Sequence, residues 1–548
     1  MNKKIKKVIS GILALGMLAS LAGCGGETVT EGASETTQES TGAEAENSQS
    51  ENISYAEGEV TYPLTDMPSL KIWASEISPS SHVASVEESP FHSGLSTNTG
   101  IAMEWEFPAA GADKEQAFNL MIAGKELPNI IWHNMMQDTE MYIEQGVIRD
   151  LTEYLPKYAP NYWKFLQENE YADKAMKTDS GKYYGFGFFR ENPWQQVYMG
   201  PLVRKDWLDE QNLPVPETIE DWTTTIKTFN EAYGAKFAFE INNQMTPAVA
   251  GAFGAYGTFE PIVYVDESGK VQFAQAQEEW KNYMGWLNSL NEEGLIDPDV
   301  TTMNDDSLRT KAANGLVGIS CSYQDAFNEA SKKSGATWIG CPYPVANAGD
   351  KVLCIAGEDG ICPAVATITA TSSEEEVIAA CRFLDYAFTE EGFYYWNFGT
   401  EGETWNMVDG KPVFTEKITN NELGMYEALR LYTGEYGWGI GIQAYDMVRQ
   451  WNVPGPAGSA AVDTWYLGNE DALAWVYPTA VVFTNDESRE LASLKNTIDA
   501  YVEEMAVKFM SGEESLDNFA TYLEALDGMQ LSRMLEIYQA GYDRYLER

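Results

Sequence analysis

Residues 113–132, with the sequence DKEQAFNLMIAGKELPNIIW, place a helix-like pattern directly before a buried strand-like run. Apolar residues from Ala117 to Ile122 recur at helical spacing, which predicts an amphipathic helix over 113–123. The short apolar run at 128–132 predicts a buried strand. A helix that leads into a buried strand is typical of an α/β fold with a mostly parallel sheet.

The same alternation extends on both sides of this stretch. Residues 70–73 (LKIW) predict a first strand, and residues 146–151 (GVIRDL) continue the alternation. Thr218 is a suitable N-cap for the helix that follows it. The helices expected further along the chain cover residues 219–233, 278–291, 373–389, 488–509 and 515–548. Ligands of such sheets bind beyond the carboxyl ends of the strands, so functional residues are expected there.

The N-terminus has the pattern of an export signal. Lysines between Lys3 and Lys7 precede an apolar run, Val8 to Ala22, that is shorter than the about 20 residues of a membrane-spanning helix. The run ends in LAGCG, which resembles the bacterial lipobox. This resemblance implies that residues 1–23 are removed and that Cys24 carries a diacylglycerol and a palmitate. Such acyl chains hold a protein at the extracellular face of a Gram-positive type of cell membrane. The alternative is a membrane-spanning helix with a coincidental cysteine.

Residues 24–58 predict a disordered acidic tether. After Cys24 this segment contains eight Glu, no Lys or Arg, and few bulky apolar residues. It cannot bury enough apolar surface to offset the entropy lost on ordering. Repulsion between its charges favours an extended spacer.

The rest of the chain, roughly 490 residues from 59 to 548, is rich in aromatic residues and has no second apolar stretch of membrane length. A body of this size is expected to form two or more lobes. Without residues 1–23, the 32 Lys and Arg against 83 Asp and Glu give a formal charge of −51. Nucleic acid is therefore excluded as a partner, because phosphate binding needs basic patches.

The cysteine and histidine content indicates neither a metal centre nor a cofactor site. Five cysteines follow Cys24, and none has the C-x-x-C spacing of zinc or redox sites. We expect buried thiols, although one disulfide is compatible with the count. The chain has three histidines and lacks the H-E-x-x-H, G-x-S-x-G and phosphate-loop motifs.

Seven segments are similar, in the same order, to segments of the extracellular solute-binding proteins of bacterial ABC importers, family 1, carbohydrate-type lipoproteins. They are MIAGKELPNI (121–130), EQGVIRDLT (144–152), DSGKYYGF (179–186), VRKDWL (203–208), EGLIDP (293–298), TEEG (389–392) and GTEGETW (399–405). The resemblance implies a class II periplasmic-binding-protein fold: two α/β lobes joined by hinge strands, with an extended helical C-terminal region. It places lobe 1 at 60–190 plus 345–430 and lobe 2 at 195–344 plus 431–548.

The same resemblance implies a monomer that captures a saccharide, in particular an oligosaccharide, in the cleft between the lobes and delivers it to the membrane permease. Sugars bind between aromatic rings, which stack on their C–H faces, and polar side chains, which bond their hydroxyls. We therefore favour aromatic, acidic and polar residues near strand ends and the lobe crossing. The candidates are Glu76, Trp132, Asn134, Arg190, Glu191, Trp194, Tyr323, Glu401, Glu403, Trp405 and Trp438. The alternatives are core packing for the aromatic residues and surface positions for the acids.

A surface-anchored glycoside-active enzyme is the alternative function. Glycoside hydrolysis needs two carboxylates about 5 to 9.5 Å apart, and a chain with 83 acidic residues offers many pairs. No hydrolase signature accompanies these acids, whereas the binding-protein segments are present. We therefore expect a binding protein and not an enzyme.

Overall fold

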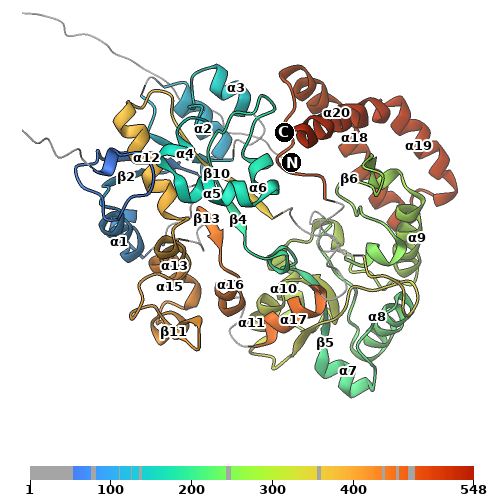
Figure 1. Ribbon diagram of the computed structural model, residues 1–548. Helices are drawn as coiled ribbons and strands as arrows, with labels where there is room; N and C mark the ends of the chain where they lie inside the picture. Colours follow the sequence, from blue (N-terminus) through green and yellow to red (C-terminus); the bar gives the residue numbers. More distant parts are fainter. Residues whose placement is uncertain are drawn as a thin grey trace, which may run out of the picture. The chain divides into compact units, whose positions relative to one another are not determined.

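The computed structural model describes residues 53–548 apart from 76–79, 81, 110, 125, 135–138, 242–247, 354–359, 435–438, 452–455 and 467–475. Cys24, Glu76 and Trp438 lie outside the described residues. The described residues build two hydrophobic cores, each around its own sheet (Figure 1). We call the core around the larger sheet the first core and the other the second core.

The larger sheet joins strands from distant parts of the chain. Its order is β13 (Gly441–Gln443), β4 (Phe186–Arg190), β10 (Ile361–Ile368), β3 (Ile130–His133), β1 (Leu70–Ala74) and β2 (Met103–Glu106). Strand β1 is parallel to β2 and β3, and β13 is parallel to β4, whereas β10 is antiparallel to both of its neighbours. The parallel pairing predicted for the first strands is thus confirmed.

The stretch that predicted this fold forms the expected elements. Helix α2 (Lys114–Ile122) begins after Asp113, whose side chain accepts a hydrogen bond of 2.7 Å from the Gln116 N–H. Every residue of β3 is buried, as a strand in the middle of a sheet requires. The alternation continues less far than predicted, because residues 146–151 contain a single bridge, from Ile148 to Thr369, in place of a strand.

The smaller sheet has three antiparallel strands in the order β8 (Ile319–Ser322), β5 (Gly200–Arg204) and β9 (Trp338–Gly340). Helices α7 (Lys205–Gln211), α8 (Ile219–Tyr233) and α9 (Glu278–Glu292) add apolar side chains to the same core. Helix α8 begins where the sequence predicts. Thr218 and Asp221 form a reciprocal capping box at its start.

Most predicted helices are present, with shifted ends. Helices α12 (Glu374–Tyr386) and α18 (Asn485–Ser511) correspond to the predictions at 373–389 and 488–509. The prediction of one helical run over 515–548 is wrong, because α19 (Phe519–Gly528) ends before α20 (Leu531–Glu547) begins. Gln530 between them has a φ of 66°, a left-handed conformation that interrupts a helix.

None of the helices in the described ranges has the length and apolar composition that a bilayer crossing requires.

The predicted tether extends too far toward the folded body. Residues 53–55 form a short 3-10 helix, and the Arg382 guanidinium donates hydrogen bonds to the carbonyl oxygens of Ala56 and Gly58. Arg382 is buried, so these carbonyl oxygens satisfy a side chain that has little access to water. Residues 53–58 therefore belong to the folded body and not to the tether predicted over 24–58.

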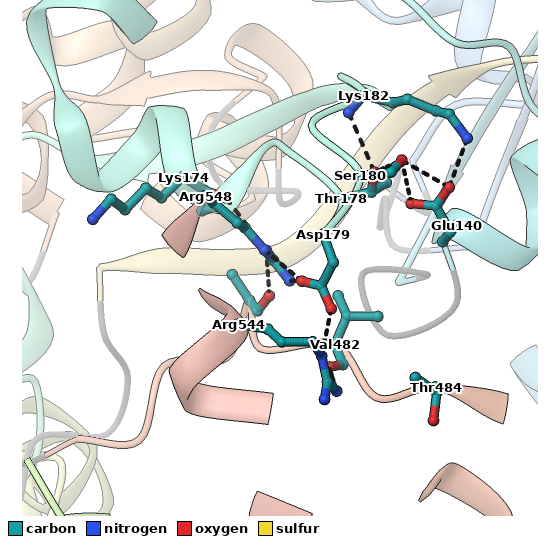
Figure 2. A network of polar contacts seen from close by, with 12 residues as sticks. Glu140, Lys174, Thr178, Asp179, Ser180, Lys182, Val482, Thr484, Arg544 and Arg548 are labelled. Atoms are coloured by element: carbon teal, nitrogen blue, oxygen red, sulfur yellow. Dashed lines mark hydrogen bonds and ion pairs between the residues drawn. The ribbon is translucent and has the colours of Figure 1, made fainter. Parts of the chain in front are cut away.

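Helix α20 contacts both cores. Its residue Ile537 packs in the second core, and Tyr545, two turns later, packs in the first core. Asp179 accepts hydrogen bonds of 2.9 Å from the Nε of Arg544 and from the Nε of Arg548 (Figure 2). These three residues form the Asp179 clamp, which fastens the end of α20 to the turn before β4.

The segment that leads into α18 also contacts the first core. Ala480 and Val481 pack there, and the Ala480 carbonyl accepts a hydrogen bond of 2.9 Å from Arg548. Strand β13 belongs to the larger sheet as well. The range 431–548, predicted for lobe 2, thus contains residues of the first core. The lobe boundaries stay a prediction.

Candidate functional site

The chain passes from the larger to the smaller sheet through η3 (Pro193–Gln196), which follows β4 and precedes β5. Asn192 caps this turn. Its side chain accepts a hydrogen bond of 2.9 Å from the Trp194 N–H, and its own N–H donates to the Gln195 side chain at 2.8 Å. The capping box fixes the backbone around Trp194, one of the predicted site residues.

Trp194 shares a carboxylate with an arginine from a distant part of the chain. The Trp194 indole N–H donates to Asp463 at 2.9 Å, and Arg449 donates to the two oxygens of Asp463 at 2.7 and 3.1 Å. Arg449 lies on α16 (Tyr445–Trp451) and Asp463 on α17 (Pro456–Tyr466). Together they link η3 with two helices.

The electrostatics keep both charged members of this group ionised. The hydrogen bonds from Arg449 hold the pKa of Asp463 below its ordinary value. The same bonds raise the pKa of Arg449 further above neutrality. The guanidinium carbon lies 5.1 Å from the centroid of the Trp194 ring, within the range of a cation–π contact. The side chains of Arg449 and Trp194 are thus held in fixed positions beside each other.

Tyr445 joins this group from the first turn of α16. Its hydroxyl accepts a hydrogen bond of 2.9 Å from Arg449, and its ring meets the Trp194 ring edge-on at a centroid distance of 5.3 Å. Its backbone N–H donates to the Glu191 carboxylate at 2.5 Å. Glu191, a predicted site residue, therefore helps to fix the start of α16.

Arg190, the third predicted residue at the crossing, lies opposite Gln443 in the β4–β13 pair. The Gln443 side-chain oxygen accepts hydrogen bonds from Arg190 and, at 3.0 Å, from Gln195. The structure therefore brings Arg190, Glu191 and Trp194 together around the start of α16.

A cavity of about 510 Å³ lies beside this group. It is lined by Lys411, Pro412, Val413, Tyr445, Asp446, Arg449 and Gln450. We call it the Arg449 cavity. Its volume is in the range of small-molecule sites. Gln450 fixes its two walls, because it accepts a hydrogen bond from the Phe414 N–H and donates one to the Pro412 carbonyl, both at 2.9 Å. These bonds join α16 to β12 (Lys411–Phe414).

The lining of the Arg449 cavity suits a hydroxyl-rich molecule. The Tyr445 ring, Pro412 and Val413 supply apolar surface, while Arg449 and Gln450 supply polar groups in fixed positions. The sequence reasoning missed Gln443, Tyr445, Arg449 and Asp463. The only signal for them was the spacing of Tyr445 and Arg449, one helical turn apart, which is common on helix surfaces.

Tyr323 lies elsewhere, directly after β8, where it is 37% exposed. Its ring stacks on Tyr198, with a centroid distance of 6.0 Å and an interplanar angle of 14°. Tyr198 precedes β5, the strand paired with β8. The two rings therefore offer an aromatic surface beside the smaller sheet, and a ligand-binding role for Tyr323 stays a prediction.

The three predicted tryptophans that the structure describes are all core residues, and Trp194 is only 3% exposed beside Tyr445 and Arg449. Trp132 is fully buried between Trp105 and Trp396, with ring centroids 6.3 and 6.1 Å away. Trp405 is buried against Tyr394, and its indole N–H donates to the Gly399 carbonyl at 3.1 Å. The predictions for all three tryptophans as ligand-binding residues are corrected, because rings enclosed in this way have no face left for a ligand.

The predicted polar residues near Trp132 and Trp405 lie at the surface. Asn134 is exposed directly after β3, as expected for a residue at a strand end. Glu401 is exposed, and Glu403 forms an ion pair with Lys417 that braces the loop before β11 (Trp405–Val408). The ion pair gives Glu403 a structural partner, which agrees with the surface alternative.

Within the described ranges, no group of three or more His, Cys, Asp and Glu side chains is arranged to hold a metal ion. Cys341 and Cys381 are buried, and burial raises the pKa of both thiols. They are apolar core groups at neutral pH.

Comparison with known proteins identifies the class to which this fold and site belong. Residues 88–392, more than half of the chain, match the family model for the bacterial extracellular solute-binding proteins. The chain belongs to this family. The predicted fold class, a class II periplasmic-binding-protein fold of two α/β lobes, is confirmed by solved structures that cover nearly 90% of the chain.

Particular relatives carry names of saccharide-binding proteins. The polygalacturonan/rhamnogalacturonan-binding protein YtcQ of Bacillus subtilis is 26% identical over 475 residues, which are 81% of this chain and 86% of that protein. The alginate-binding protein AlgQ2 superposes with a TM-score of 0.67 at 21% identity, over 89% of this chain and 100% of that one. The Streptococcus pneumoniae protein FusA in complex with kestose gives a TM-score of 0.66 at 19% identity, over 87% and 99%.

Proposed function

We propose that this protein is the substrate-binding lipoprotein of an ABC importer, and that it captures a saccharide, in particular an oligosaccharide, for delivery to a membrane permease. The observation that carries the proposal is the Arg449 cavity, where Asp463 holds Arg449 and Trp194 in place. The names of YtcQ and FusA, which refer to saccharides, support the same class of ligand.

The chemistry of the cavity fits this ligand. A sugar hydroxyl is both a donor and an acceptor, so it pairs well with neighbouring carboxylate and guanidinium groups. Asp446 and Arg449 in the lining offer such a combination, and Asp463 holds Arg449 in place with a hydrogen bond of 2.7 Å. The Tyr445 ring lies in the lining, and aromatic rings stack on the C–H faces of sugars. We assign binding roles to Tyr445 and Arg449, and positioning roles to Trp194, Glu191 and Asp463.

Transport requires that binding changes the conformation. Members of this fold class close by hinge motion of two lobes, and a ligand favours closure only through contacts that differ between the open and the closed state. We propose lobes at 60–190 plus 345–430 and at 195–344 plus 431–548, with β13 and residues 480–481 added to the first lobe. The connections through η3 and between β13 and α16 are then hinge segments.

The location of the protein follows from the lipobox. We propose that Cys24 carries the acyl chains, that residues 25–52 are the spacer, and that the folded body works as a monomer at the extracellular face of the membrane.

A thermal-shift screen of the purified protein against saccharides tests this function. A ligand at 100 times its Kd adds about 2.7 kcal/mol to the free energy of unfolding, which raises the melting temperature. We expect at least one saccharide to stabilise the wild type and to lose most of this effect in Arg449→Ala. Arg489→Ala, at an exposed position of α18, is the matched control. A screen in which no saccharide stabilises the protein contradicts the proposal.

The named relatives are binding proteins, and we propose that this chain, too, releases its ligand unaltered. Chromatography of a saccharide recovered after prolonged incubation separates this function from a glycoside-active enzyme. An intact saccharide agrees with transport, whereas shorter products favour the enzyme.

A further inference from the structure

The charges around the Arg449 cavity indicate which class of saccharide it takes. This inference rests on the proposed function, and it concerns the choice between uncharged sugars and sugars with a carboxylate. The lining contains two cations, Lys411 and Arg449. A ligand carboxylate obtains most binding energy from a cation that is not already paired with an acidic side chain of the protein. The acidic partners of Lys411 and Arg449 therefore decide which class of saccharide the cavity favours.

Arg449 is already neutralised by an acid of the protein. Asp463 accepts from it in a two-pronged arrangement, the strongest common geometry between a guanidinium and a carboxylate. Asp463 is itself fixed by the Trp194 indole N–H at 2.9 Å. A ligand carboxylate would therefore have to displace an acid that is held from two sides.

Lys411 also has an acid beside it on the cavity wall. Its ammonium lies 3.8 Å from the Asp446 carboxylate, and both groups line the same cavity. The lysine side chain is 71% exposed, so this pair contributes little to stability. The Lys411–Asp446 pair nevertheless affects ligand binding, because the negative charge of Asp446 cancels the attraction of Lys411 for a ligand carboxylate close by.

Lys411, Arg449 and Asp446 give the lining a net charge of +1, and Asp463, which pairs with Arg449 from outside the lining, brings the sum of the two pairs to zero. The formal charge of the whole chain is −47. An acidic saccharide approaching this surface meets repulsion from the whole protein and finds no uncompensated cation in the cavity lining that the structure describes. An uncharged saccharide loses nothing by this arrangement, since its hydroxyls bond to a carboxylate and a guanidinium at once.

We propose that the Arg449 cavity binds uncharged saccharides and discriminates against saccharides that contain uronic acids, with Asp463 as the specificity-determining residue. The Asp463 carboxylate neutralises the charge of Arg449, so this guanidinium does not attract the carboxylate of an acidic sugar. This specificity differs from the one that the name of YtcQ states for that relative.

Calorimetric titration with two oligosaccharides of equal length, one of galactose and one of galacturonic acid, tests the proposal. We expect the wild type to bind the galactose oligomer at least about tenfold more tightly, a difference of about 1.4 kcal/mol. We expect its affinity to change little between low and high salt, because no ligand charge is involved.

Asp463→Asn keeps the size of the side chain and removes the negative charge that neutralises Arg449. We expect this variant to shift the ratio of the two affinities toward the acidic oligomer by about tenfold. Asp446→Asn, which removes the acid beside Lys411, provides a second variant at a pair with the longer separation of 3.8 Å and should shift the ratio in the same direction, by less. Asp486→Asn makes the same change of charge on an exposed residue of α18 and should leave the ratio unchanged.

Tighter binding of the acidic oligomer by the wild type, or an unchanged ratio in both Asp463→Asn and Asp446→Asn, overturns the inference and leaves the proposed function intact. If neither these two oligomers nor any saccharide of the thermal-shift screen binds, the proposed function fails, and the inference fails with it.

Discussion

Replacing Asp179 with Asn removes the negative charge that Arg544 and Arg548 share in the Asp179 clamp (Figure 2). The two arginines differ in the polar partners that they keep after this substitution. Arg544 keeps an ion pair with Glu487 at 2.6 Å, whereas the Arg548 side chain, only 1% exposed, keeps the carbonyl oxygens of Lys174 and Ala480.

The cost follows from this difference. Leaving a buried charge without its partner costs about 3 to 5 kcal/mol, and losing an exposed pair costs about 0.5 kcal/mol. The two carbonyl oxygens and the amide oxygen of Asn offset part of the larger cost, and Asp179 is itself partly exposed. We therefore expect a loss of about 2 to 3 kcal/mol in the free energy of unfolding.

Urea unfolding of the wild type, Asp179→Asn and the control Asp486→Asn measures this loss as a shift of the midpoint. The clamp joins the end of α20 to the first core, so the transition of that core should move while the control leaves it in place. Pairing Asp179→Asn with Arg548→Met then gives the coupling energy, since residues in contact are not additive. A shift no larger than that of Asp486→Asn refutes the reasoning.

Three further predictions concern buried groups. Burial raises the pKa of Asp385 to about 6, from about 3.9 in the unfolded chain. The contribution of Asp385 to stability is therefore greatest below pH 4 and falls by about 3 kcal/mol as the pH rises through 6. Subtracting the pH profile of Asp385→Asn from that of the wild type isolates this loss. Burial lowers the pKa of His92 to about 4. The contribution of His92 to the free energy of unfolding should therefore fall by about 3 kcal/mol as the pH drops from 6.5 to 4. If the free energy of unfolding of His92→Gln falls with the same slope over this range, the prediction is contradicted. An added Cβ at Gly200 would lie 2.6 Å from the Trp465 ring of α17, so Gly200→Ala should lower the free energy of unfolding by about 1 to 3 kcal/mol and displace Asp463. Gly528→Ala, whose added Cβ meets open space, serves as the control. Equal melting temperatures for the two variants would argue against the packing at Gly200.

Local sequence patterns predicted the elements well where the physical signal was local. The capping box at Thr218 and the apolar spacing of 113–123 depend on neighbours three or four residues away, and both helices begin where expected. The break at Gln530 had no such signal, because a left-handed residue in a helical run is usually glycine or asparagine.

The candidate site was less accessible from sequence because its partners come together only in the folded chain. Gln443 reaches Arg190 through a parallel strand pair, and the two residues are 253 positions apart. Composition also cannot separate a tryptophan at a site from one in a core. Trp132, Trp194 and Trp405 all have polar neighbours in sequence, yet the structure buries all three rings away from a ligand.

Titration calorimetry of the wild type and of Arg449→Ala with the saccharide that stabilises the protein most is the most direct measurement of the central claim. We expect saturable binding of one saccharide per chain in the wild type, and at least about tenfold weaker binding in the variant, because hydrogen bonds to a charged group contribute about 1.5 to 3 kcal/mol. Equal affinities in the two proteins would contradict the assignment of the Arg449 cavity as the binding site.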